Sequence, residues 1–353
     1  MRESPVSPAP PVSVLLPFRD ADATLDEAVA SVLTWEEDLE LLLLDDGSTD
    51  DGPGRARIWE ARDGRVRVLS LPRRGLVAAL NEGLQAARGR YIARMDADDI
   101  AAPARLARQL PLLEADPGLA VVDGQVAFFR DEGPVPEGMR LHEAWINAVI
   151  APEDFRRAWS VESPVVHPAA TLRRAAVLQI GGYRAEAGSA TVTAGPVPED
   201  YDLWLRLDAA GWRFAKVPEV LVHMRDRPAR LTRTHPAYAR EAFRRARMLW
   251  LEQTALREPR RVVLWGAGRE GRPWLRWLLA SGHRVSAVID VDPRKIGSVR
   301  QGVPVRPPEA LPDLEADLCL VAVAARGARA QIRAALASLR PGWREGWDWW
   351  ALR

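Results

Sequence analysis

The sequence predicts an α/β protein of two domains, in which a doubly wound, mixed but mostly parallel sheet is followed by a second, smaller α/β sheet. In the first hundred residues, short apolar runs alternate with stretches of helical spacing, and the runs occupy residues 12–17, 39–44, 66–71 and 91–95. This alternation is typical of parallel strands connected by helices. The pattern restarts at residue 262, and a chain of 353 residues can bury two cores.

Composition excludes several classes of protein. The formal net charge of +1 indicates no affinity for nucleic acid polymers. Cys319 is the single cysteine, so an internal disulfide and a cysteine metal cluster are both excluded, which favours a reducing compartment. The first residues lack the apolar core of a signal peptide, and no apolar run approaches the roughly 20 residues that span a bilayer. We therefore expect a cytoplasmic protein, with peripheral contact at the inner face of the membrane as an open alternative.

The first two predicted strands lead into polar sequence. Residues 1–11 are rich in proline and serine, and we expect a disordered tail there. The strand over 12–17 ends at Pro17, and helical spacing follows over 21–34. The second strand, 39–44, runs directly into Asp45-Asp46-Gly47-Ser48-Thr49-Asp50. A strand that ends in such sequence before a helix is how α/β sheets form ligand sites.

The fourth predicted strand, 91–95, runs into three closely spaced acids, Asp96, Asp98 and Asp99. Crowded carboxylates repel one another unless a cation or hydrogen-bond donors lie between them. Aspartate oxygens suit Mg²⁺ or Mn²⁺. The alternative is a turn in which Asp98 or Asp99 caps the following helix. From these residues alone, both interpretations remain open.

These motifs, in this order and spacing, resemble family 2 glycosyltransferases over residues 12–235. The resemblance rests on Pro17, Asp45 to Asp50, Gly75, Asn81, Met95 to Asp99, Pro103 to Gln109, His167 to Leu172, Gly181 to Tyr183 and Glu199 to Leu207. It implies a GT-A-type fold and an inverting, metal-dependent transfer of a sugar from a nucleotide-diphosphate donor of the UDP type. The implied acceptor is a saccharide or lipid-linked hydroxyl, in the synthesis of a cell-surface polysaccharide.

The resemblance also implies roles for residues on the donor side. Asp45 or Asp46 would accept from an N–H of the base, because a carboxylate is an acceptor only; a turn at the end of the strand is the alternative. Asp96 would face the ribose. The residues expected to bind the nucleotide sugar are Pro17, Asp45, Asp46, Gly75, Asn81, Arg94, Asp96 and Arg225.

A divalent metal, Mn²⁺ or Mg²⁺, is expected on Asp98, where it would bridge the donor phosphates and stabilise charge on the leaving group. Asp99 is expected to cap the following helix, with a role as a further ligand as the alternative. His223 is predicted as a third metal ligand, and a packing role is its alternative.

Asp200 is the predicted general base. It would deprotonate the acceptor hydroxyl for in-line attack on the anomeric carbon, which inverts the configuration. The alternative is that Glu199 and Asp200 only complement the dipole of the helix that they begin. His167 and Glu199 are expected on the acceptor side of the site, although a histidine beside proline is often structural.

Two arginine-rich stretches follow. Arg225, Arg227, Arg230 and Arg233 are expected to form a mobile loop that closes over the diphosphate, with a solvated loop as the alternative. Residues 236–259 are predicted as a helical linker. Its helix, 237–256, could rest on an anionic membrane surface; we prefer the interpretation that it packs on the domain with a charged face in water.

The second domain is predicted over residues 260–353. A strand over 262–265 leads to glycines at 266, 268 and 271 and a helix, and a second strand ends at Asp290. This is the context of a dinucleotide fingerprint, so a Rossmann-like domain is expected, with candidate nucleotide contacts at Gly266, Gly268, Gly271 and Asp290. The sequence from Asp290 to Glu309 resembles the nucleotide-sugar-binding part of sugar acyltransferases and the C-terminal domain of sugar C-methyltransferases.

We expect this second domain to bind a ligand or act as a scaffold, because it contains no obvious catalytic dyad and is short for a dehydrogenase. Bound NAD(P) is the less expected alternative. For the whole chain, two rivals to the glycosyltransferase remain. One is a nucleotide- or NAD(H)-binding protein with an inactive first domain, and the other is a bifunctional enzyme that also modifies sugars.

Overall fold

The computed structural model describes residues 11–227, 235–325 and 327–352. Almost all of the predicted tail, and Arg230 and Arg233 of the predicted mobile loop, lie outside the described residues. The chain forms two compact units. The first contains Met1–Pro152, Pro164–Ala185 and Val197–Ala239, and the second contains Glu153–Ser163, Glu186–Pro196 and Arg240–Arg353.

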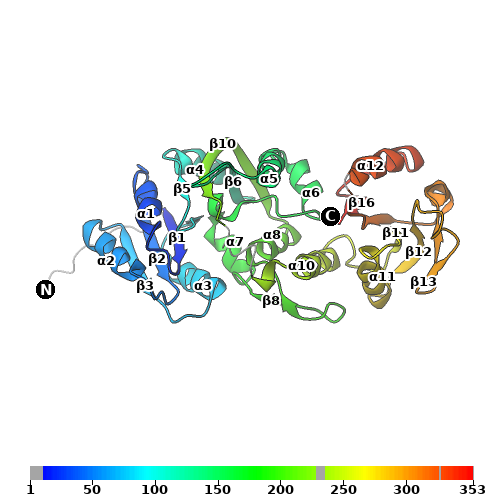
Figure 1. Ribbon diagram of the computed structural model, residues 1–353, viewed down its shortest axis with the longest axis horizontal. Helices are drawn as coiled ribbons and strands as arrows, with labels where there is room; N and C mark the ends of the chain where they lie inside the picture. The colour runs from blue at the N-terminus through cyan, green and yellow to red at the C-terminus, as the bar shows by residue number, and fades with distance from the viewer. Residues whose placement is uncertain (1–10, 228–234, 326, 353) are drawn as a thin grey trace. The chain divides into compact units, whose positions relative to one another are not determined.

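An eight-stranded mixed sheet forms the centre of the first unit, in the order β3-β2-β1-β4-β7-β6-β10-β5 (Figure 1). Its strands are β1 (Val12–Phe18), β2 (Leu39–Asp45), β3 (Val66–Ser70), β4 (Tyr91–Arg94), β5 (Ile100–Ala101), β6 (Leu119–Phe129), β7 (Thr171–Arg173) and β10 (Arg213–Arg225). β1 pairs in parallel with β2 and β4, as do β2 with β3 and β6 with β10, whereas β7 and β5 are antiparallel to their neighbours. The predicted mixed, mostly parallel sheet is confirmed.

Helices cover both faces of this sheet. Among its described residues, the helices of the first unit are α1 (Leu25–Leu33), α2 (Gly52–Arg62), α3 (Leu76–Ala86), α4 (Arg105–Ala115), α5 (Glu137–Asn147), α7 (Arg174–Gln179) and α8 (Glu199–Ala209), with short 3₁₀ turns η1 (His167–Ala169) and η2 (Pro236–Tyr238). β1 and β2 are buried along their whole length, as expected of strands with a layer on each side.

The two faces of β1 contact different helices. Val14 and Leu16 belong to the core cluster that includes residues of α1, α2 and α4. On the other face, α3 approaches so closely that a Cβ at Gly83 would lie 2.6 Å from Leu44 and 3.2 Å from Leu15. Full burial of each leucine or valine contributes about 1.5–3 kcal/mol, so this core holds the strands whose ends carry the predicted site.

The second unit contains a six-stranded sheet in the order β13-β14-β12-β11-β15-β16. Its strands are β11 (Arg261–Trp265), β12 (Arg284–Ile289), β13 (Val299–Arg300), β14 (Val303–Arg306), β15 (Leu318–Val321) and β16 (Trp349–Ala351). All pairs are parallel except the β13–β14 hairpin. The parallel strands therefore follow the order 3-2-1-4-5, as in Rossmann-like sheets, and the predicted Rossmann-like fold is confirmed.

The remaining elements of the second unit include segments distant in sequence. They are α6 (Pro152–Ala158, within this unit from Glu153), the small pair β8 (Glu186–Ala187) and β9 (Gly195–Pro196), α10 (Arg240–Gln253), α11 (Gly271–Ala280), η3 (Pro308–Asp313) and α12 (Ala328–Leu339). The predicted helix over 237–256 corresponds to η2 and α10. Within α10, Arg247 is buried, and its Nη1 donates to the Ser160 carbonyl at 3.1 Å. Among the described residues, no helix combines the length and apolar character needed to cross a bilayer.

Candidate active site

The carboxyl ends of the central parallel strands bring the predicted motifs to one edge of the first sheet. β2 ends at Asp45, which pairs with Phe18 of β1, and β4 ends at Arg94, which pairs with Leu15 of the same strand. Asp46 and Asp96 follow these ends, one on each side of β1. This is the edge at which α/β sheets bind ligands.

The first acidic box is tied to the backbone around it. Asp46 accepts from the N–H groups of Arg74 and Gly75, at 2.9 Å each, and Asp45 Oδ1 accepts from the Ser48 N–H at 2.9 Å. Gly75 precedes α3 with a φ of +89°, a conformation that favours glycine. Pro17 lies in β1 opposite Leu44. These contacts hold the backbone that leads into α3. The contacts of these residues with a nucleotide stay a prediction.

Asn81 and His167 meet at Tyr183. The Asn81 amide donates to the Tyr183 carbonyl and accepts from its N–H, both at 2.9 Å. His167 Nε2 lies 2.9 Å from the Tyr183 hydroxyl, and both rings are buried. Burial, followed by the nearby charge of Arg94, holds the pKa of His167 well below its usual value. The imidazole of His167 is therefore neutral near pH 7 and forms a hydrogen bond with the Tyr183 hydroxyl.

The three acids after β4 gather at one place. Asp96, Asp98 and Asp99 each offer a carboxylate oxygen, and these oxygens lie within 4.8 Å of one another. Arg94 is buried and pairs with Asp96. Asp99 is also buried, and its Oδ1 accepts from the Arg225 N–H of β10 at 2.8 Å. The geometry suits a hard divalent cation, whose ligands are oxygen atoms.

The expected helix cap at Asp98 or Asp99 is wrong. α4 begins only at Arg105; its N-cap position is Ala104, and no side chain caps it by a hydrogen bond. The short strand β5 lies between the acids and the helix, because Ile100 and Ala101 pair with β10. Asp99 instead accepts a hydrogen bond from β10, through the backbone N–H of Arg225.

Arg225 and His223 occupy different positions along β10. The Arg225 guanidinium donates from Nε to the Asp98 carbonyl at 2.9 Å and pairs with Glu27 and Asp131. This side chain therefore anchors the acidic loop, and its contact with a donor stays a prediction. His223 is exposed opposite Ile100 and is not part of the three-acid group.

Glu199 and Asp200 begin α8, where the helix dipole favours negative charge. Glu199 is buried, whereas Asp200 remains partly exposed. Burial, followed by repulsion from Glu199, raises the pKa of Asp200 to about 7. Burial also raises the pKa of Glu199, which lies within electrostatic range of Arg94 and Asp96. The start of α8 and the acidic loop after β4 therefore face one another.

Tyr238 belongs to the same cluster, and sequence reasoning missed it. Its hydroxyl lies 2.8 Å and 2.7 Å from the two carboxylate oxygens of Glu199. The residue follows the acidic motif by 39 positions and stands in a short 3₁₀ turn with no periodic pattern. The sequence indicates Tyr183 only as part of the Gly181-Gly182-Tyr183 motif. No local signal identifies either phenol as a partner of the site.

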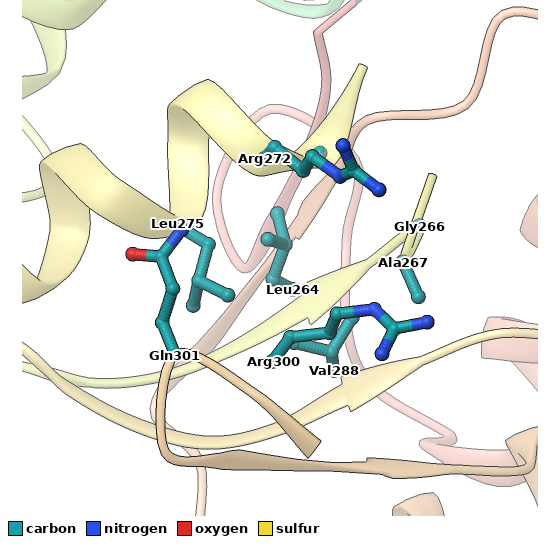
Figure 2. Close-up of a pocket in the computed structure, with 9 residues that line it drawn as sticks. Leu264, Gly266, Ala267, Arg272, Leu275, Val288, Arg300 and Gln301 are labelled. Atoms are coloured by element: carbon teal, nitrogen blue, oxygen red, sulfur yellow. The ribbon is translucent and has the colours of Figure 1, made fainter. Parts of the chain in front are cut away.

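The second unit places its predicted glycines around one loop. Gly266, at the end of β11, has a φ of +123°, and a Cβ on Gly271 would lie 1.8 Å from the Gly266 carbonyl oxygen. Gly268 has open space around it. Asp290 follows β12 and accepts from the Ala267 N–H at 2.9 Å. The loop borders a cavity of about 320 Å³ (Figure 2).

Two family models match the chain. Residues 13–181 match the family described as glycosyl transferase family 2, and residues 257–340 match the CoA binding domain. The second match agrees with the Rossmann-like sheet of the second unit.

Several proteins are similar to part of the chain. "Putative glycosyltransferase EpsE" of Bacillus subtilis is 30% identical over 220 residues, which cover 62% of this chain and 73% of that protein. The amylovoran biosynthesis glycosyltransferase AmsE of Erwinia amylovora is 28% identical over 151 residues, covering 43% of this chain and 50% of that protein. Among solved structures, TarS 1–349 of S. aureus is 17% identical with a TM-score of 0.49, covering 69% of this chain and 64% of that one.

The family match begins in β1, includes both acidic motifs after β2 and β4, and ends in the Gly181-Gly182 turn that Asn81 approaches. The EpsE alignment extends to nearly three quarters of that relative. The chain therefore belongs to family 2 of the glycosyltransferases.

Proposed function

We propose that the first unit transfers a sugar, with inversion, from a nucleotide-diphosphate donor of the UDP type to a hydroxyl group, and that Asp200 is the general base. The observation that carries this proposal is the Asp200 carboxyl, partly exposed beside the three-acid loop with a pKa of about 7. A base is most effective when its pKa lies near the working pH.

The proposed reaction forms one bond and breaks one bond at the anomeric carbon, and it transfers one proton to the Asp200 carboxylate. The acceptor oxygen forms a bond to the anomeric carbon while the bond from that carbon to the donor diphosphate breaks. The electron pair leaves with the nucleoside diphosphate, and the hydroxyl proton passes to Asp200. Glu199 is held by Tyr238 and repels the Asp200 charge, which keeps that carboxylate basic. His167, neutral and bonded to Tyr183, is proposed as an acceptor contact.

The three-acid group fits a divalent cation, because three carboxylate oxygens lie within 4.8 Å of one another. We propose Asp98 as the principal ligand, as the resemblance to the family implies, with Asp96 and Asp99 beside it. His223 stays a candidate ligand, as the resemblance implies. When bound, Mn²⁺ or Mg²⁺ would stabilise the negative charge on the diphosphate leaving group.

The nucleotide is proposed to lie between the first acidic box and Asp96. Asp45 and Asp46 already accept backbone N–H groups, but a carboxylate has about four acceptor positions, so each can accept one more from a base. Asp96 would receive the ribose. Pro17, Gly75, Asn81, Arg94 and Arg225 then act mainly by holding this edge of the sheet in place.

The acceptor is proposed to be a saccharide or a lipid-linked sugar in polysaccharide synthesis. The support is a relative named for amylovoran biosynthesis.

A donor panel tests the proposal. The purified chain would be incubated with UDP-, GDP- and dTDP-sugars, with Mn²⁺ or with EDTA, while nucleoside diphosphate release is measured. We expect release with a UDP-sugar, loss with EDTA, and losses of about 10²–10⁴-fold in Asp200→Asn and of similar size in Asp98→Ala. The stereochemistry of the product would be read by NMR.

Asp38→Asn is the matched control, because Asp38 is an exposed aspartate of the same unit outside the site. Turnover that survives Asp200→Asn would remove the general-base assignment. Turnover in EDTA equal to that in Mn²⁺ would remove the metal assignment and leave the base untouched.

A further inference from the structure

Two buried polar side chains of α4 are not used by the proposed mechanism. Arg105 and Gln109 stand one helical turn apart, and both have a relative exposure of 0%. Arg105 Nε donates to Gln109 Oε1 at 3.2 Å, so the two side chains are joined. Buried polar groups are retained where hydrogen bonds satisfy them. Their other partners lie mainly in the segment that contains His167.

Three consecutive carbonyl groups at η1 accept hydrogen bonds from these two side chains. Arg105 donates from Nη1 to the Pro168 carbonyl at 2.7 Å and from Nη2 to the Ala170 carbonyl at 3.0 Å. The carbonyl between them, that of Ala169, accepts from the Gln109 amide at 2.7 Å. A planar guanidinium holds its donors in a fixed geometry. The positions of these carbonyls are therefore set by α4.

The backbone on each side of the turn is held as well. The Val166 N–H donates to the buried carboxylate of Asp123 at 3.1 Å. The Thr171 hydroxyl donates to Gln109 Oε1 at 2.6 Å. A 3₁₀ turn of three residues contains few hydrogen bonds of its own. The surrounding polar groups therefore determine where the His167 side chain leaves the backbone.

Arg105 is buried together with its charge, and within the described part of the chain it forms no ion pair. Burial lowers its pKa to about 9, opposed by attraction to Asp123, so the guanidinium is still charged near pH 7. A buried cation is costly unless its donors are satisfied. All three of its nitrogen atoms donate to oxygen atoms, those of Gln109, Pro168 and Ala170. These directed bonds, and not an ion pair, account for an arginine at this position.

His167 links the turn to the helix that carries Asp200. Its Nε2 lies 2.9 Å from the Tyr183 hydroxyl, and its ring meets the ring of Trp204 edge-on, with the centroids 5.7 Å apart. Trp204 follows Asp200 by one turn of α8. A shift of η1 would therefore move the imidazole against two buried rings, one of them on the helix of the proposed base.

We propose that Arg105 and Gln109 are positioning residues for sugar transfer, which hold the η1 carbonyls so that the His167 imidazole keeps one orientation on the acceptor side of the site. This inference rests on the proposed acceptor contact of His167. A side chain that only stabilised the fold would affect every function of the first unit equally. A positioning residue instead acts through His167, so its effect disappears when His167 is replaced.

Ring nitrogen NMR of His167 tests the placement without an acceptor. The full chain contains five histidines, and His167→Gln identifies the signals of this one. We expect wild-type His167 to remain neutral at the ordinary histidine pKa of 6.5, because burial holds its own pKa well below that value. In Arg105→Met and in Gln109→Leu, the ring signals should shift and the imidazole should titrate closer to pH 6.5.

Turnover is then measured with the UDP-sugar that reacts in the donor panel. Arg105→Met should lower kcat by about 10–100-fold, as expected for a misplaced group, while the KM for the donor stays unchanged. His167→Gln should also lower kcat. The double variant should fall no further than the worse single variant, because the effects of residues that act through one another are not additive.

Arg108→Met is the matched control, because Arg108 lies on the same helix with an exposed side chain that pairs with Glu219 at 3.1 Å. It should alter neither the His167 signals nor kcat. Thr171→Val serves as the milder variant if Arg105→Met does not fold, since it removes a single hydrogen bond from this network. Thermal unfolding shows which variants are folded.

Three outcomes would overturn the proposal. Unchanged His167 signals in the folded variants would show that Arg105 and Gln109 do not place the ring. Fully additive losses in the double variant would show a structural role alone. Turnover unaffected by His167→Gln would instead remove the acceptor contact of the proposed function, whatever the NMR signals show.

Discussion

Glu199 and Asp200 are consecutive carboxyl groups at the start of one helix, and burial raises the pKa of both. Their surroundings nevertheless differ. Glu199 is enclosed and receives the Tyr238 hydroxyl, whereas Asp200 is partly exposed and repelled by Glu199. The two acids are therefore suited to different tasks, one as a fixed charge and the other as a group that exchanges a proton.

The rate of sugar transfer should follow the titration of Asp200. A general base acts as the carboxylate, so we expect kcat/KM to fall about tenfold per pH unit below a pKa of about 7 and to level off above it. Initial rates from pH 5 to 9 at fixed metal concentration would measure this. A flat profile across pH 7 would contradict the assignment of Asp200.

The same carboxyl should make the fold less stable as pH rises. Its folded pKa of about 7 exceeds the ordinary aspartate pKa of 3.8. The folded state therefore binds the proton more tightly, and stability is lost as pH rises from about 4 to 7. Asp200→Asn should therefore stabilise the protein at pH 8, by on the order of 1–3 kcal/mol, and much less at pH 4.5. Thermal unfolding at both pH values measures the difference; Asp38→Asn should show none.

Tyr238 should act as a positioning residue through Glu199. Tyr238→Phe removes a donor to a buried carboxylate, which raises the pKa of Glu199 and thereby weakens its repulsion of Asp200. We expect the acidic limb of the rate profile to move to lower pH, and stability at pH 8 to fall by about 1–3 kcal/mol. If the rate falls while its pH profile stays in place, Tyr238 has only a structural role.

At the scale of elements, β6 and β10 hold a buried ion pair behind the site. Lys216 Nζ lies 3.1 Å from Asp123 and donates to the carbonyls of Ile146 and Pro164 at 2.8 Å and 3.0 Å. Burial raises the pKa of Asp123, although Lys216 and two backbone amides oppose the shift. The pair joins the two long parallel strands to the segments that flank them.

Removing the lysine alone should be costly. Lys216→Met leaves the Asp123 charge buried without its partner, so we expect a loss of about 3–5 kcal/mol at pH 8. The loss should be smaller at pH 5, where Asp123 takes up a proton more readily. The double variant Asp123→Asn with Lys216→Met is the control, and chemical denaturation should show that it recovers part of the loss. Equal losses in the single and double variants would contradict this account.

At the scale of the whole molecule, the chain combines two α/β units with different electrostatic character. The edge of the first sheet collects carboxylates, with buried Arg94 and Arg225 as their partners. The cavity of the second unit instead exposes arginine charge, while its one fingerprint acid, Asp290, is saturated by its own loop.

Local pattern was enough to predict the framework, because apolar runs and turn residues are properties of neighbouring positions. The strands expected over 12–17 and 39–44 are β1 (Val12–Phe18) and β2 (Leu39–Asp45). The helix expected over 21–34 begins only at Leu25, because residues 21–24 form a turn closed by the Thr24 N–H and the Ala21 carbonyl. The acidic motifs were also found from their spacing.

The partners of those motifs depended on contacts between distant residues, which no local pattern contains. Asp99 was expected to cap a helix, yet it accepts from Arg225, 126 positions away. Tyr238 meets Glu199 across 39 positions, and Asn81 meets Tyr183 across 102. A hydrogen bond requires only that two atoms meet with the correct geometry. The sequence could therefore name the acids of the site, and only the folded chain determines which are held by donors and which are placed to take up a proton.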